Sequence, residues 1–198
     1  MSWELHRVTI VGGGMMGRSL ATKVAQEGIN VYLKEVSHEA LEAGKQELDR
    51  ALEHEIERFG LTKAEKRAIQ SRITWVTHFD CATDSDLALE AVQEDFGLKR
   101  QILRELDRRM PPDHPIVINT STLSITELAS QNSRPERIVG DVGIQRVHDP
   151  LAALARRKPQ AEGAGEALHH RFTELVAVVR GAVGGLDLDL QRARQVVG

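Results

Sequence analysis

A glycine-rich turn near the start of the chain has the residue types and spacing that bind phosphate groups. The segment Gly12-Gly13-Gly14-Met15-Met16-Gly17 has the pattern G-x-G-x-x-G, after a strand-like run and before an apolar helical pattern. In such a turn Gly12 permits the tight bend, Gly14 lets backbone approach a pyrophosphate, and Gly17 allows close helix–strand packing. The helix N-terminus would add amide donors and a positive dipole. The pattern predicts a dinucleotide site that includes Met15 and Met16.

An acidic residue follows this turn at the distance expected for a ribose contact. Glu35 lies about 20 residues after the first glycine, where a carboxylate can accept hydrogen bonds from the adenosine ribose. A carboxylate there repels a 2′-phosphate, so NAD is favoured over NADP, and the neighbouring Lys34 weakens that preference slightly. FAD and S-adenosylmethionine use related turns and stay open as alternatives, as does a glycine turn without a ligand.

Short strand patterns alternate with helical patterns over the first 141 residues, which is typical of a Rossmann-type, doubly wound α/β fold with a mostly parallel sheet. The expected strands are 7–11, 30–33, 73–77, 86–92, 116–118 and one from 138, and the expected helices include 15–26, 98–110 and 124–131. A helical-hairpin insertion is expected at 37–71, with Ser37 as the first N-cap and Thr62 opening a capping box.

The composition changes after residue 141. The segment 142–198 is rich in Ala, Arg and Gly, and it has a helical pattern near 166–180. We therefore expect two units, a nucleotide-binding domain at 1–141 and a divergent, partly helical C-terminal tail at 142–198.

Composition excludes several classes of protein. The 26 Lys and Arg against 29 Asp and Glu give a net charge of −3, which argues against non-specific nucleic-acid binding. No apolar run is long enough to span a membrane, and the N-terminus lacks the features of a signal peptide. The single cysteine, Cys81, favours the cytoplasm. The pair His169-His170 has no third ligand nearby in the sequence, so no metal site is expected.

Five segments, in order, resemble the NAD-binding domain of the 3-hydroxyacyl-CoA dehydrogenases. They are VTIVGGGMMGRSLA, VYLKEVSHEAL, DLALEAVQEDFGLKRQIL, INTSTLSITELA and RPERIVG, and they span about two thirds of the chain. The resemblance implies an oxidoreductase of fatty-acid metabolism that transfers a hydride between NAD and C3 of an L-3-hydroxyacyl-CoA.

The resemblance also implies roles for individual residues. Ala91 and Glu94 would lie near the nicotinamide half of NAD, Lys99 near its ribose, and Asn119 beside the nicotinamide. Ser121 would bond to the 3-hydroxyl or keto oxygen of the substrate. From the residues alone, a solvated helix start is the favoured interpretation of Glu94 and Lys99. The alternative interpretation of Ser121 is an N-cap or turn hydroxyl.

The hairpin of this family helps to hold coenzyme A. By that resemblance Lys63, Lys66 and Arg67 could meet its phosphates, although an ordinary charged helix face is the favoured interpretation of these three residues.

The chain departs from the family at the catalytic position. The family has a histidine, the general base, two residues after the glycine that matches Gly140, and Val142 stands there. His148 is a weak substitute by position, no partner glutamate follows, and the remaining residues do not resemble the family's second, helical domain. A frameshift near the codon for Asp141, a truncation and a divergent protein all stay open.

Two functional hypotheses follow. The first is an NAD-dependent 3-hydroxyacyl-CoA dehydrogenase with weak or absent turnover in this chain, and the second is a catalytically dead NAD-binding module or regulatory remnant. Another β-hydroxyacid dehydrogenase is a less favoured third. Without the second domain, apolar surface would be exposed, so we also expect self-association.

Overall fold

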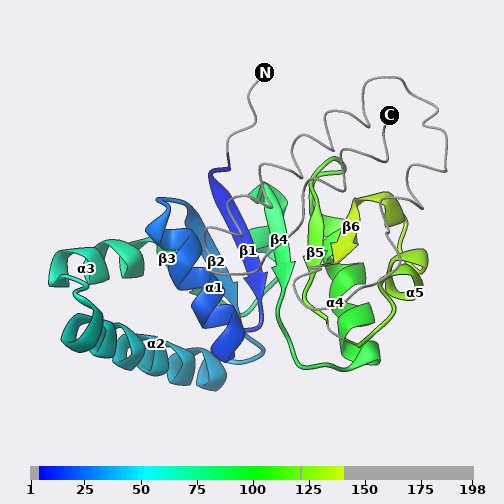
Figure 1. Cartoon of the computed structure of the whole chain (residues 1–198). Helices are drawn as coiled ribbons and strands as arrows, with labels where there is room; N and C mark the ends of the chain where they lie inside the picture. Colours follow the sequence, from blue (N-terminus) through cyan, green and yellow to red (C-terminus); the bar gives the residue numbers. More distant parts are fainter. Residues whose placement is uncertain (1–4, 121, 141–198) are drawn as a thin grey trace, which may run out of the picture.

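The structure, a computed structural model, describes residues 5–120 and 122–140. Within them lies a six-stranded, fully parallel sheet in the order β3-β2-β1-β4-β5-β6 (Figure 1). Its strands are β1 (Arg7–Val11), β2 (Asn30–Lys34), β3 (Ile73–Val76), β4 (Leu87–Glu90), β5 (Ile116–Ile118) and β6 (Ile138–Gly140). The chain runs outward from β1 in both directions, so the predicted doubly wound fold is confirmed, and the switch point lies between β1 and β4.

The helices cover both faces of this sheet. They are α1 (Met15–Gln26), α2 (His38–Phe59), α3 (Lys63–Arg72), α4 (Phe96–Arg109) and α5 (Ile125–Ser130), with short 3-10 turns at Asp80–Asp84 and Pro135–Arg137. Alternating strand residues divide the core into two layers. Val8 and Ile10 of β1 pack in one cluster with α1 and α3, whereas Val11 packs in the other with α4 and α5.

The helical hairpin forms because both of its helices carry good caps. The Ser37 hydroxyl accepts from the Ala40 amide at 3.1 Å, and Gly60 ends α2 in the left-handed conformation, with φ 82°. Thr62 and Glu65 form the predicted capping box at the start of α3. In Figure 1 α3 lies beyond the edge strand β3, and α2 runs from below α1 towards α3. The expected insertion at 37–71 is therefore present.

Two boundaries differ by two residues from the sequence prediction, the others by one at most, and side chains explain these two. The expected strand 86–92 ends as β4 at Glu90, because the Val92 amide donates to the Glu90 carboxylate at 2.7 Å instead of to a neighbouring strand. Helix α4 starts two residues earlier than predicted, because Asp95 acts as its N-cap and accepts from the Leu98 amide at 2.7 Å.

A buried ion pair joins α4 to the amino ends of β5 and β6. The Arg137 guanidinium donates to Oδ1 of Asp107 at 2.8 and 3.1 Å, and both side chains are at most 4% exposed. Arg137 also donates to the carbonyl oxygens of Pro111 and His114, in the turn before β5. This pair lies at the edge of the sheet opposite the carboxyl ends of the strands.

Several predictions fall outside the described residues. These are the conformation of the tail 142–198, the positions of Val142 and His148, and the position of Ser121. Among the described residues, no helix has both the length and the apolar character needed to span a membrane.

Candidate functional site

The carboxyl ends of the parallel strands bring most of the predicted site residues to one edge of the sheet. Gly12, Glu35, Ala91 and Asn119 directly follow β1, β2, β4 and β5. Backbone hydrogen bonds fix all four. The Gly12 amide donates to the Lys34 oxygen at 2.9 Å and the Glu35 amide to the Val76 oxygen at 2.8 Å. The Ala91 amide donates to the Val11 oxygen at 2.9 Å and the Asn119 amide to the Glu90 oxygen at 3.0 Å. Open α/β sheets bind their ligands at this edge.

The glycine turn has the shape that its sequence predicts. Gly12 has φ 104°, a conformation that favours glycine, and a Cβ there would lie 2.7 Å from the Ala91 carbonyl oxygen. A Cβ on Gly17 would collide with the Gly12 carbonyl group, so Gly17 lets α1 approach β1. A Cβ on Gly14 would meet nothing within 4 Å, which leaves that backbone open to a ligand.

Within the described residues, no N-cap side chain bonds to the first amides of α1. Gly14 is the N-cap, and the turn contains no acidic residue. The other described helices have side-chain caps, which are Ser37, Thr62, Asp95 and Ser124. Met15 and Met16 beside this turn are 81% and 48% exposed. The open amides, the dipole of α1 and the gap above Gly14 together fit the phosphates of a dinucleotide.

Glu35 lies beside this turn, at the carboxyl end of β2. Its two carboxylate oxygens accept from the amides of Gly13 at 2.7 Å and Val36 at 2.9 Å. Each carboxylate oxygen can accept a second hydrogen bond, so the group can still receive ribose hydroxyls. The Lys34 ammonium lies 4.5 Å from the centre of the Phe79 ring, and burial lowers its pKa although Glu35 opposes that effect.

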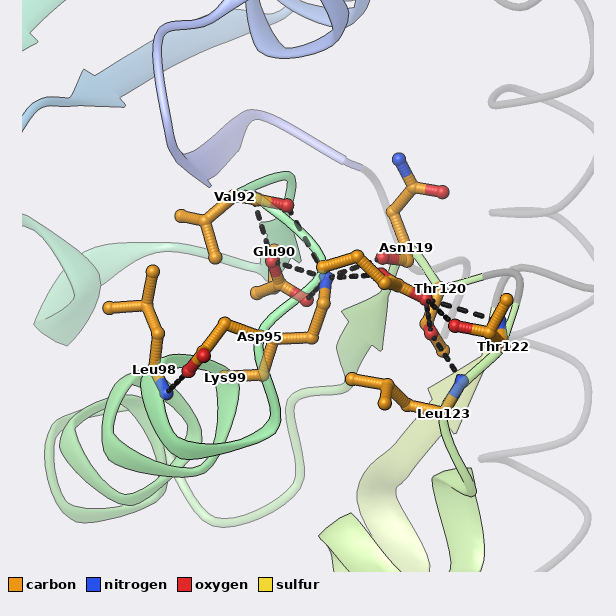
Figure 2. A network of polar contacts seen from close by, with 10 residues as sticks. Glu90, Val92, Asp95, Leu98, Lys99, Asn119, Thr120, Thr122 and Leu123 are labelled. Carbon is orange, nitrogen blue, oxygen red and sulfur yellow. Dashed lines mark hydrogen bonds and ion pairs between the residues drawn. The ribbon is translucent and has the colours of Figure 1, made fainter.

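Lys99 is the centre of a polar network at the ends of β4 and β5 (Figure 2). Its side chain is 0% exposed, and its amine donates to Glu90 at 2.7 and 2.9 Å and to the Asn119 carbonyl oxygen at 2.6 Å. The Lys99 amine also lies 3.4 Å from Glu94. Lys99 therefore holds the carboxyl ends of two strands together from inside the protein, and its contact with a ribose stays a prediction.

Glu94 is the partly exposed member of this network. Its carboxylate accepts from the hydroxyl and the amide of Thr122, at 2.9 and 3.1 Å, and from the Thr120 hydroxyl. Burial raises the pKa of Glu94, but the hydrogen bonds from these threonines and the charge of Lys99 outweigh it and lower the pKa to about 2. Glu94 is thus ionised at neutral pH, as a solvated glutamate also is, but its carboxylate is held in place by Thr120, Thr122 and Lys99.

Glu90 was missed by the sequence reasoning. It is a 0% exposed carboxylate at the end of an otherwise apolar strand, Leu87–Glu90. The signal was available, because a charged residue at a core position requires a partner of opposite charge. Only the tertiary structure shows that this partner is Lys99 from the next helix.

Lys66, which the family resemblance offers as a possible coenzyme A contact, is buried within the hairpin. Lys66 is 8% exposed, and its amine lies 2.6 Å from Asp49 and 2.5 Å from Glu53 on α2. It joins the two helices of the hairpin, so it does not lie on a solvated charged face, which was the favoured interpretation. Lys63 and Arg67 are exposed, in agreement with a charged helix face.

In the part of the chain that the structure describes, no group of three or more His, Cys, Asp or Glu could hold a metal ion.

The fold and the turn define a dinucleotide-binding domain of the dehydrogenase type.

Comparison with known proteins identifies the family. Residues 7–141 match the 3-hydroxyacyl-CoA dehydrogenase NAD binding domain. The chain is 33% identical over 137 residues to a probable 3-hydroxybutyryl-CoA dehydrogenase of Bacillus subtilis, covering 69% of this chain and 48% of that protein. It is 32% identical over 162 residues to the fatty acid oxidation complex subunit alpha of Psychrobacter arcticus, covering 81% and 22%.

A solved structure leads to the same family. The crystal structure of (S)-3-hydroxybutyryl-CoA dehydrogenase from Ralstonia eutropha matches with a TM-score of 0.71 and 28% identity, covering 90% of this chain and 61% of that one. The chain therefore belongs to the 3-hydroxyacyl-CoA dehydrogenase family, and residues 7–141 are its NAD-binding domain. It spans about half or less of the length of the curated relatives described above.

Proposed function

We propose that this domain binds NAD at the carboxyl edge of its sheet, as part of a 3-hydroxyacyl-CoA dehydrogenase. The observation that carries the proposal is the first turn of α1, where open amides face the gap above Gly14. The carboxylate of Glu35 supports NAD over NADP, because it would repel a 2′-phosphate. When bound, NAD supplies the hydride chemistry, and the residues described here hold and orient it.

Binding of NADH can be tested with the protein's own fluorescence. The ring of Trp75 lies beside the glycine turn, since a Cβ on Gly13 would be 2.9 Å from it. We expect energy transfer from Trp75 to bound NADH. The variant Gly14→Val should fold, because its Cβ has room, and should lose binding, because the side chain fills the space of the phosphates. Ser19→Val, an exposed position further along α1, is the matched control.

No energy transfer in the unaltered chain, with Trp75 folded as described, would overturn the proposal. Loss of binding by Ser19→Val as well as by Gly14→Val would show that the effect is not specific to the turn.

The substrate and the turnover belong to a second part of the proposal. The family and its relatives support an acyl-CoA substrate, in the form of a 3-hydroxyacyl-CoA or 3-ketoacyl-CoA. Ser121 keeps its proposed contact with the substrate oxygen. Because Val142 stands where the family has its basic histidine, we propose weak or absent turnover. The alternative is a catalytically dead NAD-binding module.

Turnover can be measured directly as oxidation of NADH in the presence of acetoacetyl-CoA. A rate near that of an uncatalysed control supports the proposal, whereas rapid turnover would refute it and the dead-module alternative together. His148→Ala would then show whether His148 is the base. Sequencing of the DNA around the codon for Asp141 tests whether another frame encodes the missing histidine. A cytoplasmic location stays part of the proposal, supported by the single, buried Cys81.

A further inference from the structure

Glu90, Lys99 and Glu94 form a charge cluster with a defined net charge. The Glu90 carboxylate accepts hydrogen bonds from the Lys99 amine and from the Val92 amide, and in these contacts it is only an acceptor. A protonated carboxyl group would need an acceptor of its own, so this arrangement fits an ionised Glu90 beside a charged Lys99. Burial raises the pKa of Glu90, and the Lys99 cation opposes that rise. With Glu94 also ionised, the cluster carries a net charge of about −1.

The position of the cluster relative to the cofactor follows from the topology. The phosphate-binding turn follows β1, and the ribose carboxylate Glu35 follows β2, so the adenosine half extends over β2. A dinucleotide bound across the switch point must therefore place its other half over β4 and β5, on the opposite side of β1 (Figure 1). The cluster lies at the carboxyl ends of these two strands (Figure 2).

We propose that this cluster makes the domain bind oxidised NAD more tightly than NADH, relative to a domain without its negative charge. The nicotinamide ring carries a positive charge in the oxidised form and is neutral in the reduced form. A net negative charge beneath it therefore attracts only the oxidised form. The inference rests on the proposed NAD site and goes beyond it, because it assigns a preference between the two redox states to named residues.

The expected size follows from Coulomb's law. A unit charge about 10 Å from the ring, at an effective dielectric constant of about 20 to 25, changes the ratio of the two affinities by about ten-fold. Because Glu90 is buried, salt screens this effect less than it screens an exposed charge.

The test measures two dissociation constants for each variant. That of NADH comes from energy transfer from Trp75, and that of NAD+ from displacement of bound NADH. Glu90→Gln removes one negative charge with little change in size, so the ratio Kd(NAD+)/Kd(NADH) should rise about ten-fold. Glu94→Gln should move the ratio in the same direction, and since this side chain is 34% exposed, the fold should tolerate it.

A double variant separates charge from structure. Glu90→Gln combined with Lys99→Met removes one negative and one positive charge, so the net charge of the cluster stays the same. The Kd ratio should then return to within about two-fold of the unaltered chain, as expected when the Coulomb difference cancels. If these residues served only to hold the loops, the double variant would weaken both forms of the cofactor equally and Glu90→Gln would not change the ratio.

Asp107→Asn is the matched control. Like Glu90, Asp107 is a buried carboxylate paired with a buried cation, but it lies at the opposite edge of the sheet. It should lower the stability and leave the Kd ratio unchanged. An equal shift of the ratio in this control would overturn the inference.

Failure of the inference differs from failure of the proposed function. If the unaltered chain binds neither NADH nor NAD+, both fall. If it binds them, and Glu90→Gln and Glu94→Gln weaken the two forms to the same degree, only the inference falls.

Discussion

The two glycines of the turn should respond in opposite ways to the same substitution. A Cβ on Gly17 would lie 2.9 Å from the Gly12 carbonyl carbon and still nearer its oxygen, and these are backbone atoms that cannot rotate away. A Cβ on Gly14 would meet nothing within 4 Å, and its φ of −62° suits any residue. Gly17→Ala must therefore displace α1 from β1, whereas Gly14→Ala changes no contact within the folded chain.

The structure sets the size of this difference. Inserting a methyl group into a well-packed site costs about 1 to 3 kcal/mol, and the immovable carbonyl places Gly17→Ala at about 3 kcal/mol. For a chain of this size that corresponds to a melting temperature lower by about 6 to 12 °C. Gly14→Ala should change the stability by less than about 1 kcal/mol, with a slight gain because alanine restricts the unfolded chain.

Thermal unfolding followed by circular dichroism, with urea unfolding as a second measurement, compares the two variants with the unaltered chain. A melting temperature for Gly17→Ala within about 2 °C of the unaltered chain would refute the reasoning. Equal losses of stability in both variants would also refute it, because alanine would then be unfavourable throughout the turn and not at Gly17 in particular.

Arg137→Met should destabilise the fold by about 3 to 5 kcal/mol in urea unfolding, because it leaves Asp107 buried without its cation; a loss below about 1 kcal/mol would contradict the importance of this pair. Stability should fall in acid. Folding lowers the pKa of Glu94 to about 2 and also lowers the pKa of Asp107. The two carboxylates therefore contribute fully to the free energy of unfolding above about pH 5, and this contribution is lost as the pH falls towards 2. Glu94→Gln should flatten that acid limb, and an unchanged limb would exclude Glu94 as its source. Glu35→Gln should lower the ratio Kd(NADPH)/Kd(NADH) about ten-fold by removing the repulsion of the 2′-phosphate, a unit-charge effect that binding titrations would detect. Sedimentation of the chain should show self-association, and a stable monomer would oppose that prediction.

Local sequence signals were sufficient for most of the fold because each depends on neighbouring residues. The caps Ser37 and Thr62, the terminating Gly60 and the glycine turn all act within a few residues of their position. Alternating strands and helices then restrict the topology, since crossover connections between parallel strands are nearly always right-handed.

The roles of charged residues were harder to predict because they depend on distant partners. Lys66 read as a residue on a charged helix face, but Asp49 and Glu53, on the preceding helix, hold its amine. Glu94 and Lys99 read as a solvated helix start without the family resemblance. The threonines after β5 and the buried Glu90 give them a different environment. No periodicity in the sequence specifies such pairs.

The sequence by itself determined the doubly wound fold and the glycine turn, and it predicted the preference for NAD that Glu35 implies. Each of these follows from short-range backbone geometry or from one charge at a fixed spacing. Only the tertiary structure decided that Glu90, Lys99 and Glu94 form one cluster. That decision requires β4, α4 and β5 to meet at the same edge, where the cost of burying a charge is offset by its partners.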